Sequence, residues 1–355
     1  MIKKTKDTLQ RFRAPQDLAG IDSALLNGGT KGWASPRESH PIVLTCDENY
    51  AMPLATTLRS MVEANRTGAC LELFVLTSGF SDGKRRQVLE SLPSGSVALR
   101  WVPVGLSSFK EFSTQPYIST MTYARLLLPH IFPDTVSKVL YLDADVLVLD
   151  DLSLLWEIDL EGAVLGAVID TYSRAHTERL GLKANLSDPG PDRARSRGVC
   201  EYFNAGVLLI DLRRWRQERV SERAIQYLME HPQALLSDQD ALNVVSVGGW
   251  KELDLRWNFQ DHDPAGYSRI RPQGGLPAII HFAGRYKPWD PSSLNLGADV
   301  YDAFRSRTQF ARTPRDRLRD AGRHCWAWLK HCLKRYRLMG FIYGVFTHKQ
   351  AADQA

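Results

Sequence analysis

Short apolar runs alternate with segments of helical periodicity from residue 41 onward. PIVLT at 41–45 has the length and composition of a buried strand, and DENYAMPLATTLRSMVEAN after it spaces its apolar side chains along one face of a helix. The same order recurs with LELFVLT at 71–77 and DGKRRQVLESL. Further apolar runs typical of strands lie at 97–104, 138–149, 162–170, 206–212 and 277–284. Strands separated by helices predict an α/β fold with a mostly parallel central sheet.

Three segments depart from this pattern. Residues 1–40 show no clear periodicity, and we expect a loosely ordered extension there. The stretch 171–200 is polar and rich in Arg, Pro and Asp, so it is predicted to be a lid or a substrate loop rather than core. Residues 301–355 form a tail of different composition. We therefore predict one domain over 41–300, with an extension before it and a tail after it.

The composition is that of a globular protein. Hydrophobic residues make up 44% of the 355 residues, which argues against a disordered chain. The five cysteines form no CxxC pair, so they indicate neither a zinc site nor a disulfide framework, and a reducing compartment is the simplest interpretation. We expect no secretory signal, because no apolar run follows the basic N-terminus, and no membrane-spanning helix, because the chain has no apolar run of about 18 residues.

The positive charge is concentrated in the tail. Nine basic and two acidic residues lie within 312–337, which gives this segment a charge of +7 against +5 for the whole chain. Trp326, Leu329, Leu333 and Tyr336 recur there with helical spacing. A basic aromatic helix is typical of segments that lie on an anionic membrane surface. A helix packed on the domain is the plainer alternative. No recognition motif supports a nucleic-acid interface, and we expect none.

Two carboxylates interrupt the most apolar of the predicted strands. Asp143 and Asp145 lie within YLDADVLVLD at 141–150, and residues two apart on a strand point to the same face. Buried carboxylates side by side repel each other unless a cation lies between them. A hard divalent ion such as Mg²⁺ or Mn²⁺ is the natural counterion. Two further D-x-D triplets occur, at 238–240 and 261–263, so the triplet alone is not specific for a metal site. The buried strand residues on both sides of Asp143 and Asp145 are what favour a metal site here.

A second group of candidate residues lies in HFAGRYKPW at 281–289. The imidazole of His281 can complete a metal shell with the two aspartates. Gly284 lets the backbone turn close to a ligand, and Lys287 is a point charge suited to phosphate. A core histidine and a surface lysine explain these residues one at a time, but their compact grouping favours the functional interpretation.

These groups are expected at one edge of the sheet. Asp47, the two aspartates of the DAD triplet and His281 all lie at or just past the ends of predicted strands. Ligands in open α/β sheets bind beyond the carboxyl ends of the strands. The sequence therefore predicts one shared site.

Two weaker motifs each admit a structural explanation. In FNAGVLLIDLRRW at 203–215, the amide of Asn204 suits a sugar, but a tight turn before a strand explains the motif equally well. In SDQDALN at 237–243, Ser237 is a plausible helix N-cap, and the acidic residues behind it would be favoured by the helix dipole. That account of the second motif is complete without any function.

Arg125 lies in TMTYARLLLP, on an otherwise apolar helix. One interpretation is that its stem covers core surface while its guanidinium lies in solvent. The other is a fork-shaped donor to a sugar or a phosphate.

Taken together, these blocks resemble the retaining glycosyltransferases of family 8, and most nearly the bacterial α-galactosyltransferases that build lipooligosaccharide. The matching motifs follow the family's order and are TCDENYA (45–51), TYARLLLP (122–129), YLDADVLVL (141–149), YFNAGVLLIDL (202–212), SDQDALN (237–243) and HFAGRYKPW (281–289). They span about two thirds of the chain. The resemblance implies a single-domain, Rossmann-like nucleotide-sugar fold of the GT-A type.

By position, the resemblance also implies three groups of site residues. The expected manganese ligands, which could also take Mg²⁺, are Asp143, Asp145 and His281. The expected contacts of the UDP part, with the tyrosine as the ring that stacks on uracil, are Thr45, Asp47, Asn49, Tyr50, Ala144, Gly284 and Lys287. The expected residues around the donor sugar are Arg125, Asn204, Ala205, Asp238 and Gln239.

The implied activity is the transfer of galactose or glucose from a UDP-sugar to a saccharide or glycolipid acceptor. A double displacement would need a carboxylate on the face opposite UDP. Gln239 is expected nearest that face, and an amide is a poor nucleophile. Asp238 and Asp240 are the nearby acids of the motif. We therefore favour attack by the acceptor from the front face, with an oxygen of UDP taking the proton.

Two other functions share parts of this pattern. A self-glucosylating initiator similar to glycogenin would need an acceptor tyrosine on the protein itself. An inactive UDP-sugar-binding module should have lost metal ligands, whereas this chain retains the expected set. Together with the family's lipid-linked acceptors, the basic tail favours a cytoplasmic protein at the inner face of a membrane.

Overall fold

The computed structural model describes residues 40–109, 112, 119–182, 201–262, 276–290, 295, 297–316, 318–319 and 322. The expected N-terminal extension, most of the 171–200 stretch beyond residue 182, and the basic aromatic segment after residue 322 lie outside the described residues.

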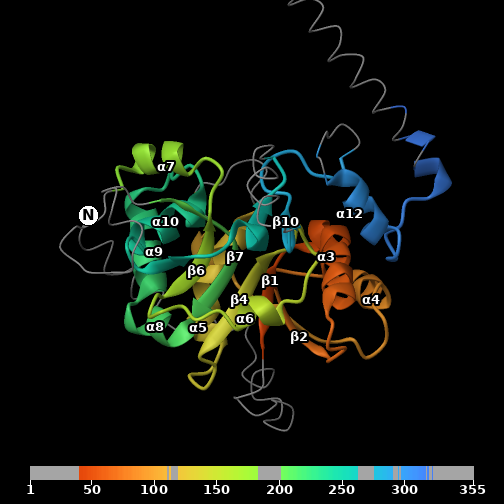
Figure 1. The fold of residues 1–355 in the computed structure, drawn as a ribbon, viewed down its shortest axis with the longest axis horizontal. Coiled ribbons are helices and arrows are strands. Elements are labelled where there is room, and N and C mark those ends of the chain that lie inside the picture. The colour runs from red at the N-terminus through yellow and green to blue at the C-terminus, as the bar shows by residue number, and fades with distance from the viewer. Residues whose placement is uncertain are drawn as a thin grey trace, which may run out of the picture.

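A seven-stranded sheet forms the centre of the molecule (Figure 1). In spatial order its strands are β3 (Val97–Pro103), β2 (Leu71–Thr77), β1 (Ile42–Thr45), β4 (Lys138–Asp143), β7 (Phe203–Asp211), β6 (Leu165–Ile169) and β8 (Trp250–Glu252). β7 is antiparallel to both of its neighbours, and the other paired strands of this sheet are parallel. The predicted α/β class with a mostly parallel sheet is confirmed.

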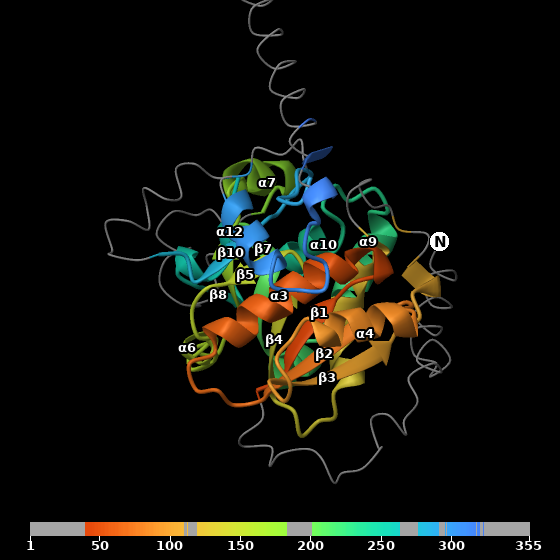
Figure 2. The same ribbon diagram turned by 90° about the vertical axis from the view of Figure 1, so that its right-hand side faces the viewer.

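Helices cover both faces of this sheet (Figures 1 and 2). The helices near β1 and β2 are α3 (Ala51–Ala64), α4 (Asp82–Glu90) and α12 (Ala298–Arg305). Those on the opposite side are α5 (Leu128–Ile131), α8 (Leu212–Gln217), α9 (Val220–Glu230) and α10 (Ser237–Val245). Two short helices, α6 (Ser153–Trp156) and α7 (Ser173–Leu180), follow β5 and β6.

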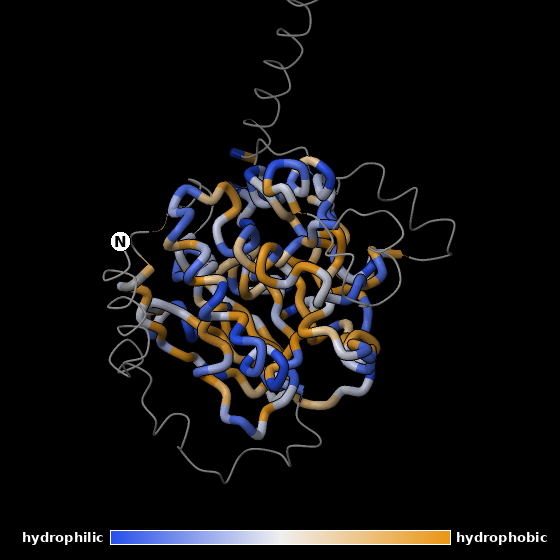
Figure 3. The backbone as a smooth tube through the Cα atoms, turned by 90° about the vertical axis from the view of Figure 1, so that its left-hand side faces the viewer, coloured by the Kyte–Doolittle hydropathy of each residue, from blue (hydrophilic) through white to orange (hydrophobic). Residues whose placement is uncertain are grey.

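The central strands are buried on both faces, which explains their continuous apolar sequence. Along β1, Val43 belongs to the core shared with α9 and α10, whereas Ile42 and Leu44 belong to the core shared with α3. Figure 3 shows the apolar stretches gathered in the interior of the body and polar stretches at its periphery. Within the described part of the chain, no helix has the length and apolarity needed to cross a membrane.

The apolar run predicted as one strand over 138–149 is two strands in different sheets. β4 ends at Asp143, a turn follows at Ala144 and Asp145, and β5 (Val146–Val148) then joins a small sheet with β10 (Ile279–His281) and β9 (Phe259–Gln260). The expectation that a continuous strand aims both aspartates to one face is therefore wrong. The chain brings them together by changing sheets between them.

Side chains of α3 hold this turn in place. The hydroxyl of Thr57, which is fully buried, lies 2.9 Å from the carbonyl oxygen of Ala144 and 2.7 Å from that of Val146. One turn later, Ser60 Oγ accepts the backbone N–H of Val148 at 2.9 Å. Buried carbonyls need such partners because water cannot reach them.

The start of the predicted tail packs on the domain. The hydroxyl of Tyr301 in α12 lies 3.3 Å from Sδ of Met52, and Arg307 pairs with Glu63 of α3 at 2.8 Å. Arg312 donates to the backbone carbonyl of Trp289 at 3.2 Å. The packed body thus continues beyond the boundary predicted at residue 300, through Arg312.

Thr57→Val should destabilise the turn that carries the two aspartates. The substitution keeps the shape but leaves two buried carbonyls without this donor, so we expect the free energy of unfolding to fall by about 1–3 kcal/mol. Thr56→Val is the matched control, because Thr56 is equally buried and donates to the carbonyl of Met52 in its own helix. Urea unfolding of the three proteins would decide, and equal losses in both variants would contradict the assigned role of Thr57.

Candidate active site

A cavity of about 610 Å³ opens where the carboxyl ends of β1, β4 and β6 meet the amino end of the antiparallel strand β7. Thr45 ends β1, Asp143 ends β4, Asp170 follows β6, and Asn204 lies at the start of β7; all four residues line the cavity. The end of β10 adds His281 from the small sheet. The shared site predicted at the strand ends is therefore a real cavity.

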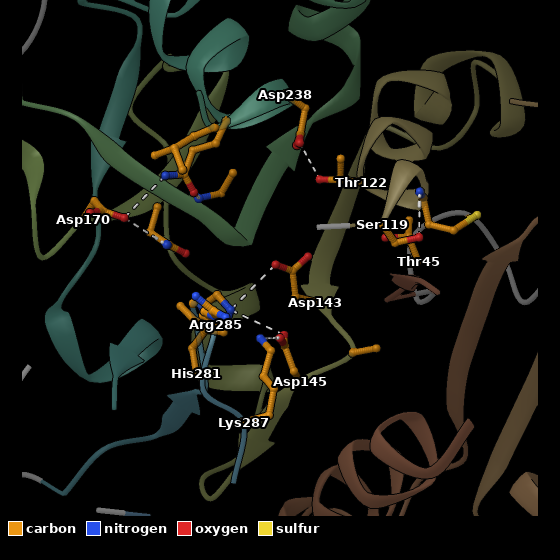
Figure 4. Close-up of a pocket in the computed structure, with 18 of the residues that line it drawn as sticks. Thr45, Ser119, Thr122, Asp143, Asp145, Asp170, Asp238, His281, Arg285 and Lys287 are labelled. Atoms are coloured by element: carbon orange, nitrogen blue, oxygen red, sulfur yellow. Dashed lines mark hydrogen bonds and ion pairs between the residues drawn. The ribbon is translucent and has the colours of Figure 1, made fainter. Parts of the chain in front are cut away.

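Asp143, Asp145 and His281 converge on one side of this cavity (Figure 4). Each offers a ligand atom, and the three atoms lie within 4.8 Å of one another. Nε2 of His281 is 3.7 Å from Oδ2 of Asp143 and 3.5 Å from Oδ1 of Asp145, which is longer than an ordinary hydrogen bond of about 2.7–3.2 Å. The spacing fits a cation between the three groups, and two carboxylates with one imidazole suit Mn²⁺ or Mg²⁺.

Gly206 makes room for this cluster. A Cβ atom at this position would lie 2.1 Å from Cε1 of His281 and 2.9 Å from Oδ2 of Asp143. Real Cβ atoms essentially never approach other heavy atoms that closely, so any larger residue here would force the side chains of His281 and Asp143 or the backbone to shift. The close approach of β7 to the ligand atoms gives this glycine a role that the sequence interpretation did not recognise.

Cations from two elements neutralise the aspartates. Nζ of Lys287 lies 2.5 Å from Oδ2 of Asp145 and 2.8 Å from the carbonyl oxygen of Phe282. Burial raises the pKa of the Asp145 carboxyl, but Lys287 and His281 lower it more, so the net pKa lies well below its usual range. Asp145 is thus ionised while it is nine-tenths buried.

Arg125 neutralises Asp143 from the other side. Its Nη2 donates to Oδ1 of Asp143 at 3.0 Å, its Nε lies 2.9 Å from Oδ2 of Asp238, and its guanidinium lies over the ring of Tyr141. Another of its N–H groups donates to the carbonyl of Ala205. Only 4% of Arg125 is exposed, so the interpretation that places its guanidinium in solvent is wrong. Burial raises the pKa of Asp238 to about 6, although Arg125 opposes this shift.

The N-terminus of α10 brings Asp238 and Gln239 to the cavity. The predicted N-cap role of Ser237 is wrong, because Leu236 precedes the helix and Ser237 is its first residue, with a φ of 52°. The carboxylate of Asp240 instead accepts the backbone N–H of Leu236 at 3.0 Å.

Asp240 itself does not line the cavity. It is fully buried, accepts both terminal N–H groups of Arg179 in α7 at 2.7 and 3.0 Å, and accepts the hydroxyl of Tyr202 at 2.7 Å. The structure therefore separates Asp240, which was expected near the reacting sugar with the rest of its motif, from Asp238 and Gln239, which do line the cavity.

Most residues predicted to contact the UDP part line the same cavity. Thr45, Asp47, Tyr50 and Ala144 line it, whereas Asn49 is exposed and does not. Burial raises the pKa of the Tyr50 phenol, and the neighbouring carboxylates add to this, so its ring is neutral.

A short hydrogen-bond chain ties Thr45 to the DAD turn. The hydroxyl of Tyr141 donates to Asp143 at 2.7 Å and accepts from Thr45 at 2.8 Å. Gly284 and Lys287 also line the cavity, and Gly284 adopts a φ of 93° that favours glycine.

Several cavity residues were not predicted. Asp170 ends the strand run at 162–170, so the rule that found Asp47 and Asp143 could also have found it. Tyr172 and His176 lie in the segment predicted as a substrate loop, and both line the cavity. Their sequence context, a polar stretch without periodicity, gave no signal for individual residues.

Comparison with known proteins adds an independent observation. A family model described as glycosyl transferase family 8 matches residues 41–292. General stress protein A of Bacillus subtilis is 29% identical over 76% of this chain and 94% of that protein. Lipopolysaccharide 1,2-glucosyltransferase of Escherichia coli is 26% identical over 72% of this chain and 74% of its own length. A solved structure of the galactosyltransferase LgtC, with donor and acceptor sugar analogues, superposes with a TM-score of 0.64 at 30% identity, covering 79% of this chain and 99% of that one.

Gly206→Ala should push His281 away from the aspartates. We expect a loss of about 1–3 kcal/mol of folding free energy from overpacking, together with loss of Mn²⁺ binding at this site. Gly249→Ala is the control, because a Cβ there meets only Ser246 at an ordinary 3.7 Å. Calorimetric Mn²⁺ titration beside urea unfolding would test both effects. Mn²⁺ binding that is unchanged in Gly206→Ala would show that the cluster is not the metal site.

Proposed function

The chain belongs to glycosyl transferase family 8, and from this premise we propose that it transfers galactose or glucose from a UDP-sugar to a saccharide acceptor with retention of configuration. The observation that carries the proposal is the convergence of Asp143, Asp145 and His281 on a cavity of about 610 Å³. Membership in this family confirms that the chain is a glycosyltransferase. The donor, the metal and the acceptor are the proposed parts.

The metal proposed for the cluster is Mn²⁺, with Mg²⁺ as the alternative. Asp143, Asp145 and His281 would hold it, and the glycine at 206 leaves the space that the cluster needs. When bound, such an ion supplies Lewis-acid stabilisation of the departing diphosphate. A degenerate UDP-sugar-binding module would not need to keep three ligands and their supporting glycine.

Lys287 is the residue proposed to hold the diphosphate from the protein side. Its ammonium lies beside Asp145 at the wall formed by the HFAGRYKPW segment. The backbone turns sharply at Gly284, which would let a phosphate approach the chain closely. A fixed positive charge at this point would stabilise the negative charge that develops on UDP as the glycosidic bond breaks.

The residues proposed to surround the donor sugar are already positioned by one another. Gln239 Oε1 accepts the backbone N–H of Ala205 at 2.9 Å, and Arg125 bridges Asp143 and Asp238. Asn204 lies beside them at the start of β7. Pre-set contacts of this kind avoid reorganisation during the reaction.

The surroundings of Gln239 support front-face attack. Of its two acidic neighbours in the motif, Asp238 is 2% exposed and bound to Arg125 and Thr122, and Asp240 is 0% exposed and bound to Arg179. A carboxylate engaged in this way is a poor nucleophile. In the proposed mechanism, the acceptor hydroxyl attacks the anomeric carbon on the side that UDP leaves, and its proton passes to a phosphate oxygen of UDP.

The acceptor is proposed to enter past Tyr172. This side chain lines the cavity, is 57% exposed, and stacks on His262 with ring centroids 5.5 Å apart and an angle of 10° between the planes. An exposed aromatic face at the mouth of a polar cavity suits the apolar face of a sugar ring.

A lipid-linked acceptor and a peripheral position at the inner face of a membrane are proposed from the tail sequence alone. Its excess of basic and aromatic residues favours an anionic membrane surface. The cytoplasmic location is part of the same proposal, and no nucleic-acid partner is proposed.

Release of UDP from UDP-galactose and UDP-glucose in the presence of Mn²⁺ should depend on Asp145. We expect slow hydrolysis of one donor by the wild-type protein and a fall of at least about 1,000-fold in Asp145→Ala, because several kcal/mol of charge stabilisation are lost. Asp151→Ala is the control, since Asp151 is a buried carboxylate outside the cavity. Gln239→Ala should lose only part of the activity. Hydrolysis that persists in Asp145→Ala would contradict the proposed site.

Intact mass after incubation with each UDP-sugar and Mn²⁺ should remain that of the unmodified chain. Front-face attack forms no bond between sugar and protein. A hexose found on Asp240 would instead establish a double displacement, and a hexose found on a tyrosine would establish the self-glucosylating alternative. Peptide mapping of any mass increase distinguishes the two.

A further inference from the structure

A chain of buried amides leads from the cavity wall to His281. Nδ1 of His281 lies 2.9 Å from Oδ1 of Asn258, Nδ2 of Asn258 donates to Oδ1 of Asn204 at 2.9 Å, and Nδ2 of Asn204 donates to Oδ2 of Asp170 at 3.1 Å. Asn258 is 0% exposed, Asn204 5% and Asp170 7%. These residues come from a 3₁₀ helix (Leu255–Asn258), β7 and the end of β6, so the chain is a feature of the tertiary structure.

The donor and acceptor directions along this series of hydrogen bonds are fixed at Asp170. An ionised carboxylate only accepts hydrogen bonds, so Asn204 must turn its NH₂ group toward Asp170. Its amide oxygen then faces the backbone N–H of Gly206, which lies 3.0 Å away and only donates. The two ends of the Asn204 side chain therefore agree on one orientation of the amide.

The orientation of Asn204 then fixes Asn258. The oxygen of Asn204 also receives the NH₂ group of Asn258, so the oxygen of Asn258 faces His281. That oxygen can only accept, and Nδ1 of His281 must carry the proton. A neutral imidazole protonated at Nδ1 has a bare lone pair at Nε2, the atom that lies 3.5 and 3.7 Å from the two aspartates.

We propose that Asn258, oriented by Asn204 and Asp170, is a positioning residue that keeps a proton on Nδ1 of His281, so that Nε2 is the ring nitrogen available to a cation between Asp143 and Asp145. Outer-shell partners that fix the tautomer of a histidine also raise its affinity for a metal ion. Only this last consequence rests on the proposed function, because the proton on Nδ1 is itself a property of the metal-free protein.

The proton on Nδ1 can be observed directly in the full-length protein. Long-range ¹H–¹⁵N correlation spectra of metal-free, ¹⁵N-histidine-labelled protein report which ring nitrogens are protonated. The His281 signals are assigned by their loss in His281→Gln. We expect a protonated Nδ1 in the wild-type protein.

Two substitutions of Asn258 separate its positioning role from a merely structural one. Asn258→Leu removes the acceptor, so the Nε2–H tautomer should become populated and Mn²⁺ affinity should fall about 10- to 100-fold. Asn258→Asp keeps an acceptor at Nδ1 but faces the oxygen of Asn204 with another acceptor. It should therefore lose stability and still keep the Nδ1–H tautomer and Mn²⁺ binding.

Asn243→Leu is the matched control. Asn243 is a buried asparagine that bonds the backbone of Phe203 through both ends of its amide, without contact to His281 in the described hydrogen bonds. It should cost stability and leave the His281 tautomer unchanged.

The outcomes decide between distinct failures. A wild-type His281 without a proton on Nδ1, or an Asn258→Leu protein in which Nδ1 stays as fully protonated as in the wild-type protein, would overturn the proposal. The proposal would also be wrong if the fraction of protein protonated at Nδ1 fell in proportion to the loss of stability in Asn258→Leu, Asn258→Asp and Asn243→Leu alike. If Nδ1 is protonated in the wild-type protein, and Asn258→Leu alone loses this proton, but no variant binds Mn²⁺, the positioning role stands and the proposed metal-dependent function fails.

Discussion

The repulsion between Asp143 and Asp145 is the constraint around which the site is organised. Both carboxylates are largely withdrawn from water, and each needs a compensating charge. Arg125 supplies one from the 3₁₀ helix η4 (Thr120–Leu127), and Lys287 supplies the other from the segment after β10. The imidazole of His281 lies between them, with Nε2 3.5 Å from Asp145 and 3.7 Å from Asp143. Three segments far apart in the sequence are thus tied to one turn, and the fold around the cavity follows from holding them there.

The switch between sheets makes that arrangement possible. A continuous strand would separate the two side chains by a fixed repeat and leave both on one flat face. Ending β4 at Asp143 and starting β5 at Val146 lets the main sheet carry one carboxylate while the turn carries the other. The turn exposes backbone carbonyls inside the protein, and Thr57 of α3 satisfies two of them. The position of the aspartates therefore depends on a helix that contributes no side chain to the cavity.

Local rules predicted most of the strands and the cluster of Asp143, Asp145 and His281, whereas the residues expected around UDP and the donor sugar were implied by the family resemblance. Apolar runs bounded by helical segments identify buried strands, and the edge where parallel strands end identifies the site, which was enough to place Asp47, Asp143 and His281 together. The remainder depends on tertiary contacts. Arg125 is buried by residues of η4, β7 and α10, and no local sequence pattern predicts this burial. Asp240 has the same sequence context as Asp238, yet a partner in α7 turns it into a structural anchor. Gly206 and Asn258 act through close approach and hydrogen bonding to a residue more than twenty positions away.

The charge of the cavity explains why neutral amides link Asp170 to His281. Asp47, Asp143, Asp145, Asp170 and Asp238 already line this space. A carboxylate in direct contact with the imidazole would fix the same tautomer, but it would place one more negative charge in the low-dielectric wall behind the cluster. An amide has both a donor and an acceptor, so two amides in series can transmit the acceptor-only character of a distant carboxylate without moving its charge. At Asp170, the N–H of Tyr172 and the amides of Asn204 and Gln239 share the negative charge and set the direction of the hydrogen bonds. At the other end, Nδ1 of His281 meets a hydrogen-bond acceptor of the same direction but without the charge.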